Sequence, residues 1–353
     1  MQKKYISLGL MSGTSGDGVD ASVIISDGIS SYESLKNKYF EYDDEIYKKI
    51  HFLKEKINNL MDLEKIAKDL SDLEKKITFF HAKIIKDFNI KYEDFLVGFH
   101  GQTIYHNASE KISKQLGDGR LLHQLIKKKI ICNFRKNDLE NGGEGAPLTP
   151  LFHRLIVSQR KIKLPVCLLN IGGISNITII EKLTEEGGLF SQDIGPGNCL
   201  IDSWVRKNSE KKFDTNGKLS ESGEINEIIL EQAQELYANR NKKDKLSFDV
   251  SDFDISFARG LSLADGARML TDFTANIIGE GLVKNIRKFN GSIKNILLCG
   301  GGRKNKVLIE KIQHILDPNI KLKPIDVFKI NGDFIESQAF AFLAIRSFCK
   351  LPI

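Results

Sequence analysis

Cysteine is scarce in this chain, and its placement argues against stabilisation by disulfides or zinc. The five cysteines are odd in number and scattered, and no two of them form a CxxC pair. Zinc sites and disulfide frameworks normally show such paired spacing. Cys167, Cys199 and Cys299 stand in apolar segments or beside glycine-rich turns, where we expect buried small hydrophobic side chains. A reducing cytoplasm is the predicted compartment.

Long apolar runs are also missing. No run approaches the roughly 20 residues that a helix needs to cross a bilayer. Lys3 and Lys4 stand near the N-terminus, but glycines and serines interrupt the apolar stretch after them, so we predict no signal peptide. We therefore expect no membrane partner.

The positive charge is not concentrated in a patch, although the formal net charge is +6. Lysines between Lys48 and Lys76 alternate with Asp and Glu, which is typical of a solvated helix face and not of a nucleic-acid site. We expect no nucleic-acid partner. Hydrophobic and charged contents of 41% and 28% fit a folded globular protein, and 353 residues suffice for two domains.

The chain does have glycine-rich turns beside apolar segments. The most prominent are residues 13–18, 193–198 and 300–305. Glycine lets backbone N–H groups approach a phosphate with no Cβ in the way. A carboxylate inside such a turn can meet a metal ion or a water beside that phosphate. The pattern predicts a nucleotide-dependent phosphotransferase with Asp193 at the reacting centre.

The first turn joins two predicted strands, residues 5–11 and 19–25, into a hairpin. Gly, Asp and Ser also occur in hairpin turns that have no function. The commonest hairpin loops have about two residues, whereas this loop is longer and carries two hydroxyls and an acid. It does not match the Walker or dinucleotide-binding spacing. We interpret it as a phosphate-binding loop, with a plain turn as the alternative.

Polar groups follow two further predicted strands, at residues 95–99 and 130–134. The first strand runs into His100, at a position where α/β proteins place ligand contacts; a satisfied core histidine is the alternative. Arg135 follows the second strand and suits a carboxylate or phosphate. An internal ion pair with Asp138 is the alternative for Arg135.

The second half of the chain looks like a diverged copy of the first. Predicted strands at residues 166–169 and 174–180 flank a glycine turn at residues 170–173, and Asp193 follows at the end of this sheet. A strand at residues 295–298 leads into the third glycine turn.

Helical periodicity recurs between these strands. Helices are predicted within residues 60–90, 147–159, 199–205, 261–286, 307–315 and 336–348. Glu336 opens the last of them, where an acid often serves only as a capping charge. The helix at residues 307–315 would direct its positive end at whatever lies over the third glycine turn.

Together these residues resemble the signatures of the anhydro-N-acetylmuramic acid kinases. The resemblance covers nearly the whole chain in order: residues 9–20, 98–103, 134–138, 145–148, 170–173, 193–198, 300–305 and 336–341. Gly16 departs from the family, which usually has a larger apolar residue there, and Glu144 stands where the family usually has Gln. Neither departure removes a chemical group that the reaction needs, although Glu144 adds a negative charge near an acidic substrate.

The resemblance implies an α/β fold of two related actin/hexokinase-like (ribonuclease H-like) domains with an ATP cleft between them. We expect the first domain at residues 1–135, with the helix at 336–353 packed back on it, and the second at residues 136–335. The family also implies a homodimer.

Enzymes of this family convert 1,6-anhydro-N-acetylmuramic acid, ATP and water into N-acetylmuramic acid 6-phosphate and ADP, in the recycling of peptidoglycan. The resemblance implies that Asp193 is the general base on the attacking water and that Glu336 helps to position the water or sugar. It implies that Mg²⁺ binds near Asp17, and that Arg135 pairs with the lactyl carboxylate of the sugar. The implied ATP contacts are Gly13, Thr14, Ser15, Gly16, Asp17, Gly18, Val19, Asp20, Gly195, Gly197, Asn198, Gly300, Gly301, Gly302 and Asn305. The implied sugar contacts are His100, Gln102, Arg135 and Asp138.

Two other functions in the same fold stay open at this point. One is an ATP-binding regulatory protein that clamps nucleotide without turning over a sugar. The other is a phosphoanhydride hydrolase, which would leave Arg135, His100 and the glycine loop before Pro147 without an anionic sugar to explain them.

Overall fold

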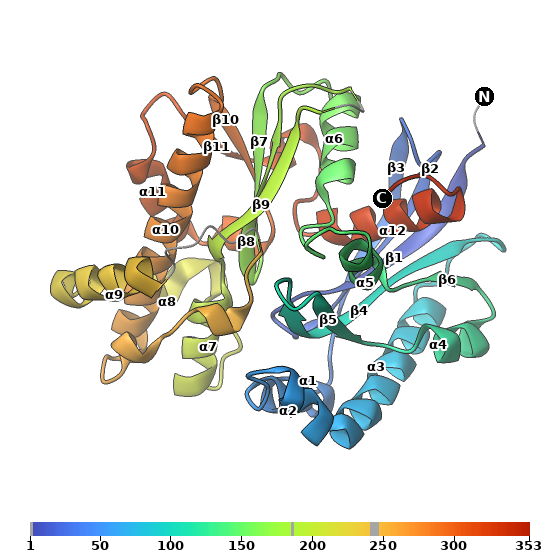
Figure 1. The fold of residues 1–353 in the computed structure, drawn as a ribbon, viewed down its shortest axis with the longest axis horizontal. Coiled ribbons are helices and arrows are strands. Elements are labelled where there is room, and N and C mark those ends of the chain that lie inside the picture. Colours follow the sequence, from blue (N-terminus) through green and yellow to red (C-terminus); the bar gives the residue numbers. More distant parts are fainter. Residues whose placement is uncertain (1–2, 185–186, 241–246) are drawn as a thin grey trace. The chain divides into compact units, whose positions relative to one another are not determined.

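The chain divides into two compact α/β units in a computed structural model that describes residues 3–184, 187–240 and 247–353. Unit 1 comprises Met1–Lys161 and Phe334–Ile353, and unit 2 comprises Ile162–Asp333. Each unit is built on one mixed β-sheet with helices packed against it (Figure 1).

The sheet of unit 1 has the order β3-β2-β1-β4-β5, and β6 also pairs with β4. The strands are β1 Tyr5–Ser12, β2 Gly18–Ser26, β3 Tyr32–Glu41, β4 Leu96–Asn107, β5 Ile112–Leu116 and β6 Lys129–Ile131. β2 is antiparallel to both β1 and β3, whereas β4 is parallel to β1 and to β6 and antiparallel to β5. The predicted β1–β2 hairpin is therefore confirmed, whereas β3 and β5 were not predicted.

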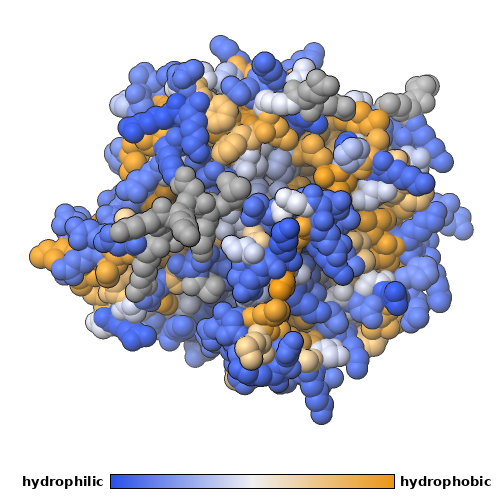
Figure 2. Space-filling view, viewed as in Figure 1, coloured by the Kyte–Doolittle hydropathy of each residue, from blue (hydrophilic) through white to orange (hydrophobic). Residues whose placement is uncertain are grey.

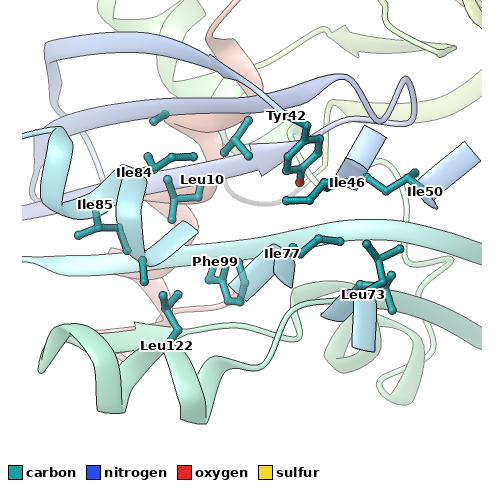
Figure 3. Close-up of a cluster of buried hydrophobic side chains, with 14 of the residues drawn as sticks. Leu10, Tyr42, Ile46, Ile50, Leu73, Ile77, Ile84, Ile85, Phe99 and Leu122 are labelled. Atoms are coloured by element: carbon teal, nitrogen blue, oxygen red, sulfur yellow. The ribbon is translucent and has the colours of Figure 1, made fainter. Parts of the chain in front are cut away.

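Successive residues of β1 point to opposite faces of this sheet, and both faces are covered. The helices of unit 1 are α1 Asp44–Lys54, α2 Leu60–Lys65, α3 Ala67–Asp87, α4 Gly119–Ile126, α5 Phe134–Glu140, α6 Pro150–Gln159 and α12 Ile335–Phe348. On one face Leu10 and Phe99 join Ile50 of α1 and Ile77 of α3 in a buried cluster (Figure 3). On the other face Met11 packs with α12.

The predicted helix over residues 60–90 is divided in the structure. α2 ends at Lys65 and α3 begins at Ala67, because Ile66 between them has φ −109° and ψ 18°. The apolar periodicity continues across Ile66, so the sequence pattern did not reveal the break.

The division between the units lies after Lys161, whereas we expected it after residue 135. Helix α6 packs within unit 1, since the ring of Phe152 lies 4.8 Å from that of Tyr32 and 5.6 Å from that of Phe342. Gln159 also bonds both backbone groups of Tyr32, at 3.0 and 2.7 Å. The glycine-rich loop before α6 is therefore internal to unit 1.

The sheet of unit 2 has the order β11-β10-β7-β8-β9. Its strands are β7 Val166–Ile171, β8 Ile174–Ile180, β9 Leu189–Pro196, β10 Asn295–Cys299 and β11 Lys321–Pro324. β7, β8 and β9 are antiparallel neighbours, whereas β10 is parallel to β7 and β11 is parallel to β10. Strands β9-β8-β7-β10-β11 thus repeat the order and directions of β3-β2-β1-β4-β6, which confirms the predicted copy.

The helices of unit 2 contribute to two buried clusters. They are α7 Cys199–Asn208, α8 Lys218–Ser222, α9 Glu227–Arg240, α10 Leu263–Lys288 and α11 Lys306–Ile315. Ile278 of α10 and Leu308 of α11 pack against Leu169 of β7 in one cluster. Trp204 of α7 and Phe273 of α10 belong to the other. The exposed fractions of the three cysteines predicted to be buried, Cys167, Cys199 and Cys299, are 0%, 7% and 1%.

No helix in the described parts of the chain is both long and apolar enough to cross a membrane. Hydrophilic side chains cover most of the face drawn in Figure 2, with hydrophobic groups scattered among them.

Two glycines allow α12 to lie directly on the strands of unit 1. A Cβ on Gly9 of β1 would lie 1.9 Å from the carbonyl oxygen of Ser337. A Cβ on Gly98 of β4 would lie 2.2 Å from the carbonyl oxygen of Phe340. Because the obstacle is helix backbone in both cases, no rotamer change could relieve the clash.

We expect Gly98→Ala to lower the free energy of unfolding by about 1–3 kcal/mol, the usual cost of overpacking. Urea unfolding measures this loss. Gly172→Ala is the matched control, because its Cβ would meet no atom closer than 3.6 Å. Equal stabilities of the two variants would contradict the account of α12 packing.

Candidate functional site

The tip of the first hairpin, residues 13–17, joins β1 to β2. Gly16 has φ +63°, a conformation that L side chains rarely adopt. Ser15 Oγ donates to Asp17 Oδ1 at 2.6 Å, so the acid and a hydroxyl of the predicted phosphate-binding loop lie side by side. Val19 differs from the other predicted contacts, because its side chain is fully buried in the core and only its backbone could meet a ligand.

The hairpin tip is tied to β4. β1 and β4 are parallel, so their carboxyl ends meet at one edge of the sheet, with Ser12 paired to Gln102. Gln102 Nε2 donates to Gly13 O at 2.9 Å. β4 extends to Asn107, well past the predicted end at residue 99, so His100 and Gln102 lie within the strand.

His100 is buried, and both of its ring nitrogens have partners in the protein. His100 Nε2 must accept a hydrogen bond, because it lies 2.8 Å from the Nε–H of Arg135 and an arginine side chain has no acceptor. Nδ1–H then donates to Gly101 O at 2.6 Å. Burial, with help from the Arg135 charge, holds the pKa of His100 well below its usual 6.5, so the ring is neutral. The structure therefore places His100 where it orients Arg135.

Arg135 and Asp138 both lie on α5 and meet the same glycine. Arg135 Nη1 donates to Gly145 O at 2.8 Å, and Asp138 Oδ2 accepts from Gly145 N–H at 2.8 Å. A Cβ on Gly143 would lie 2.2 Å from Asp138 Oδ2, so only glycine allows this carboxylate its place. Asp138 thus shapes the loop that holds Arg135. Glu144 lies half-buried in the same loop.

Glu336 stands in the first turn of α12 and is partly buried. Burial raises its pKa above the usual 4.5, and the charge of Arg135 opposes that rise. One turn later on α12, the ring of Phe340 lies 4.6 Å from that of His100. Unit 1 therefore brings His100, Arg135 and Glu336 together.

Asp193 lies within β9, three residues before the strand ends at Pro196, and is 4% exposed. Its Oδ2 accepts a hydrogen bond from the backbone N–H of Phe248 at 2.9 Å. Asn176 of β8 is its cross-strand neighbour. The contact from Phe248 was not predicted, because the polar segment that contains this residue carries no motif.

The glycines after Asp193 are fastened to the β7–β8 turn. Gly197 N–H donates to Gly173 O at 2.9 Å, and Asn198 N–H donates to Gly172 O at 2.8 Å. A Cβ on Gly197 would lie 2.2 Å from Gly172 O. Gly195 has φ +155° and faces Ile277 of α10.

The glycine turn at residues 300–305 lies against the two other glycine turns of unit 2, those at residues 170–173 and 193–198. Gly300 has φ +77°, and a Cβ there would lie 2.5 Å from Ile171 O. Cβ atoms on Gly301 and Gly302 would lie 3.8 and 3.1 Å from the side chain of Asn198. Asn305 plays a different part, since its Oδ1 caps α11 by accepting from Leu308 N–H at 3.1 Å.

Within residues 3–184, 187–240 and 247–353, no cluster of three or more His, Cys, Asp or Glu side chains could hold a metal ion. Asp17 offers one carboxylate, which suits a Mg²⁺ ion that keeps water and phosphate oxygens as its other ligands. The Mg²⁺ assignment stays a prediction, as do the other ligand contacts.

Two α/β units with one shared strand order define a protein of the actin/hexokinase-like class. The family model described as anhydro-N-acetylmuramic acid kinase matches residues 4–353, so the chain belongs to this family. A relative of that name from Pelagibacter ubique (strain HTCC1062) is 54% identical, over 100% of this chain and 94% of its own. Another, from Gluconobacter oxydans (strain 621H), is 35% identical over 98% of this chain and 94% of its own.

A solved structure, the activator of the 2-hydroxyisocaproyl-CoA dehydratase from Clostridium difficile with bound ADPNP, is similar over 100% of this chain and 99% of its own. Its TM-score is 0.43 and its sequence identity is 11%.

We expect Glu336→Gln to be more stable than the wild type at pH 8, because the partly buried carboxylate must ionise there. Since its pKa is raised on folding, wild-type stability falls as the pH rises above the usual value of 4.5. The difference between variant and wild type should close as the pH falls below that value.

Urea unfolding at several pH values measures this effect, with Glu310→Gln as control, because Glu310 is exposed on α11. A wild type that is more stable than Glu336→Gln at pH 8 would overturn the expectation.

Proposed function

We propose that the chain phosphorylates 1,6-anhydro-N-acetylmuramic acid with ATP while opening its anhydro ring with water. The products are N-acetylmuramic acid 6-phosphate and ADP, and the process is the recycling of peptidoglycan. The observation that carries the proposal is the buried, oriented carboxylate of Asp193 in a chain that matches this kinase family from residue 4 to residue 353.

In the proposed reaction, Asp193 takes a proton from the water that attacks the anomeric carbon. The bond from that carbon to O6 breaks, and O6 accepts the γ-phosphoryl group of ATP. The Phe248 N–H fixes one carboxylate oxygen and so keeps the base in one orientation. Glu336 helps to position the water or the sugar.

The hairpin tip would bind the β- and γ-phosphates through backbone N–H groups, as glycine-rich loops do. In unit 2, the turn at residues 195–198 would contact the nucleotide, and that at residues 300–302 would hold its adenosine end. Mg²⁺ held near Asp17 would offset the charge on the transferring phosphoryl group.

Arg135 would pair with the lactyl carboxylate of the sugar. Its guanidinium is already fixed by His100 and by Gly145 O, so little freedom is lost when the sugar binds. His100 and Asp138 would therefore act on the sugar through Arg135, and Gln102 would act through the hairpin tip that it holds.

A homodimer in the cytoplasm is proposed from the family alone. A regulatory ATP-binding protein and a phosphoanhydride hydrolase are not favoured, because the relatives over the full chain are named as kinases.

We expect Asp193→Asn to lower kcat by about 10²–10⁴-fold, the range of general base catalysis, while the Kd for ATP stays nearly unchanged. Asp317→Asn is the control, because Asp317 is an exposed residue beyond α11. Steady-state kinetics and calorimetric ATP titration measure the two quantities. Retained turnover in Asp193→Asn would refute the base assignment.

We expect Arg135→Ala to raise the KM for the anhydro sugar by roughly 10-fold or more, because a charge-assisted hydrogen bond is lost. The KM for ATP should not change. Arg287→Ala, at an exposed position of α10, is the control.

A sugar without the lactyl group, 1,6-anhydro-N-acetylglucosamine, sharpens this test. Removing Arg135 should have little effect on the KM for that sugar. An equal rise for both sugars would show that Arg135 does not meet the lactyl carboxylate.

A further inference from the structure

Helix α1 lies against the hairpin tip, although its sequence carries no motif that predicts this contact. A Cβ on Gly16 would lie 2.9 Å from Ile50 Cγ2 and 3.7 Å from His51 Nε2. In this chain, the helix therefore fills one side of the tip.

Lys54 extends this contact one helical turn beyond Ile50. Its Nζ donates to Thr14 O at 2.8 Å, and the side chain is half-buried. A lysine in the last turn of a helix is also favoured by the helix dipole, so the position suits a fixed ammonium group.

Two other carbonyl groups of the tip also accept hydrogen bonds from different elements. Gly13 O accepts from Gln102 Nε2 at 2.9 Å, and Asp17 O accepts from Tyr42 N–H at 2.9 Å. The peptide bonds are trans, so a carbonyl and the N–H of the next residue point in opposite directions. Each of these N–H groups therefore points away from the donor that holds the carbonyl of its own peptide group.

Two of these N–H groups have no partner among the residues that the structure describes, those of Thr14 and Ser15. They share peptide groups with Gly13 O and Thr14 O, the carbonyls held by Gln102 and Lys54. Successive free N–H groups in a turn can form an anion-binding concavity.

We propose that Lys54 is a positioning residue that holds the Thr14 peptide so that the hairpin tip presents N–H groups to the terminal phosphates of ATP. The proposal rests on the proposed kinase function. Lys54 would affect ATP binding by holding the hairpin tip, and it would not contact the sugar.

The test compares the affinities of the full-length wild type and of Lys54→Met for Mg-ATP and for AMP, which lacks the β- and γ-phosphates. We expect Lys54→Met to weaken Mg-ATP binding about 10-fold, as for a lost charge-assisted bond, and AMP binding less than about 2-fold. Lys54→Arg should restore most of the affinity, because it keeps a donor. Lys48→Met is the matched control, being an exposed lysine of the same helix.

Each outcome decides the question. Unchanged Mg-ATP affinity in Lys54→Met, or an equal loss for Mg-ATP and AMP, overturns the positioning role. A wild type that neither binds Mg-ATP nor phosphorylates the anhydro sugar refutes the proposed function instead. Should Lys54→Met fail to fold, Lys54→Gln carries the same comparison, because Gln lacks the charge and the reach.

Discussion

The close contact between α12 and the sheet of unit 1 is the constraint on which much of that unit depends. The helix backbone touches β1 and β4 at Gly9 and Gly98, where any side chain would collide with a carbonyl oxygen. Through this contact, residues 334–353 pack in the same unit as residues 1–161. It also places Glu336 within the influence of the Arg135 charge, and the ring of Phe340 4.6 Å from that of His100.

Several of the predicted site residues make hydrogen bonds that orient one another. A neutral His100 accepts from Arg135, and Asp138 folds the loop whose Gly145 oxygen holds the same guanidinium. In unit 2, a backbone N–H from Phe248 orients Asp193. Such supporting contacts keep a site close to its productive geometry before a substrate arrives. Because the side chains are already ordered, less conformational entropy is lost when the substrate binds.

The sequence was most informative where local pattern decides structure. The β1–β2 hairpin, the repeated strand–turn–strand of unit 2 and the glycine turns at residues 172–173, 197 and 300–302 follow from short motifs. The family resemblance extended them to a function, and the match over residues 4–353 bears out the family.

The sequence did not reveal contacts that join distant segments. Lys54 meets Thr14 across 40 positions, and Phe248 meets Asp193 across 55. Neither partner stands in a motif, so no local signal marks them. The boundary after Lys161 was missed for the same reason, since only the packing of Phe152 and Gln159 against Tyr32 assigns α6 to unit 1.

The most direct test of the central claim is ADP release from Mg-ATP, measured with 1,6-anhydro-N-acetylmuramic acid, with N-acetylmuramic acid and without sugar. The account predicts sustained ADP release only with the anhydro sugar, together with one equivalent of N-acetylmuramic acid 6-phosphate for each ADP. ADP release at the same rate without any sugar would contradict it and identify a hydrolase.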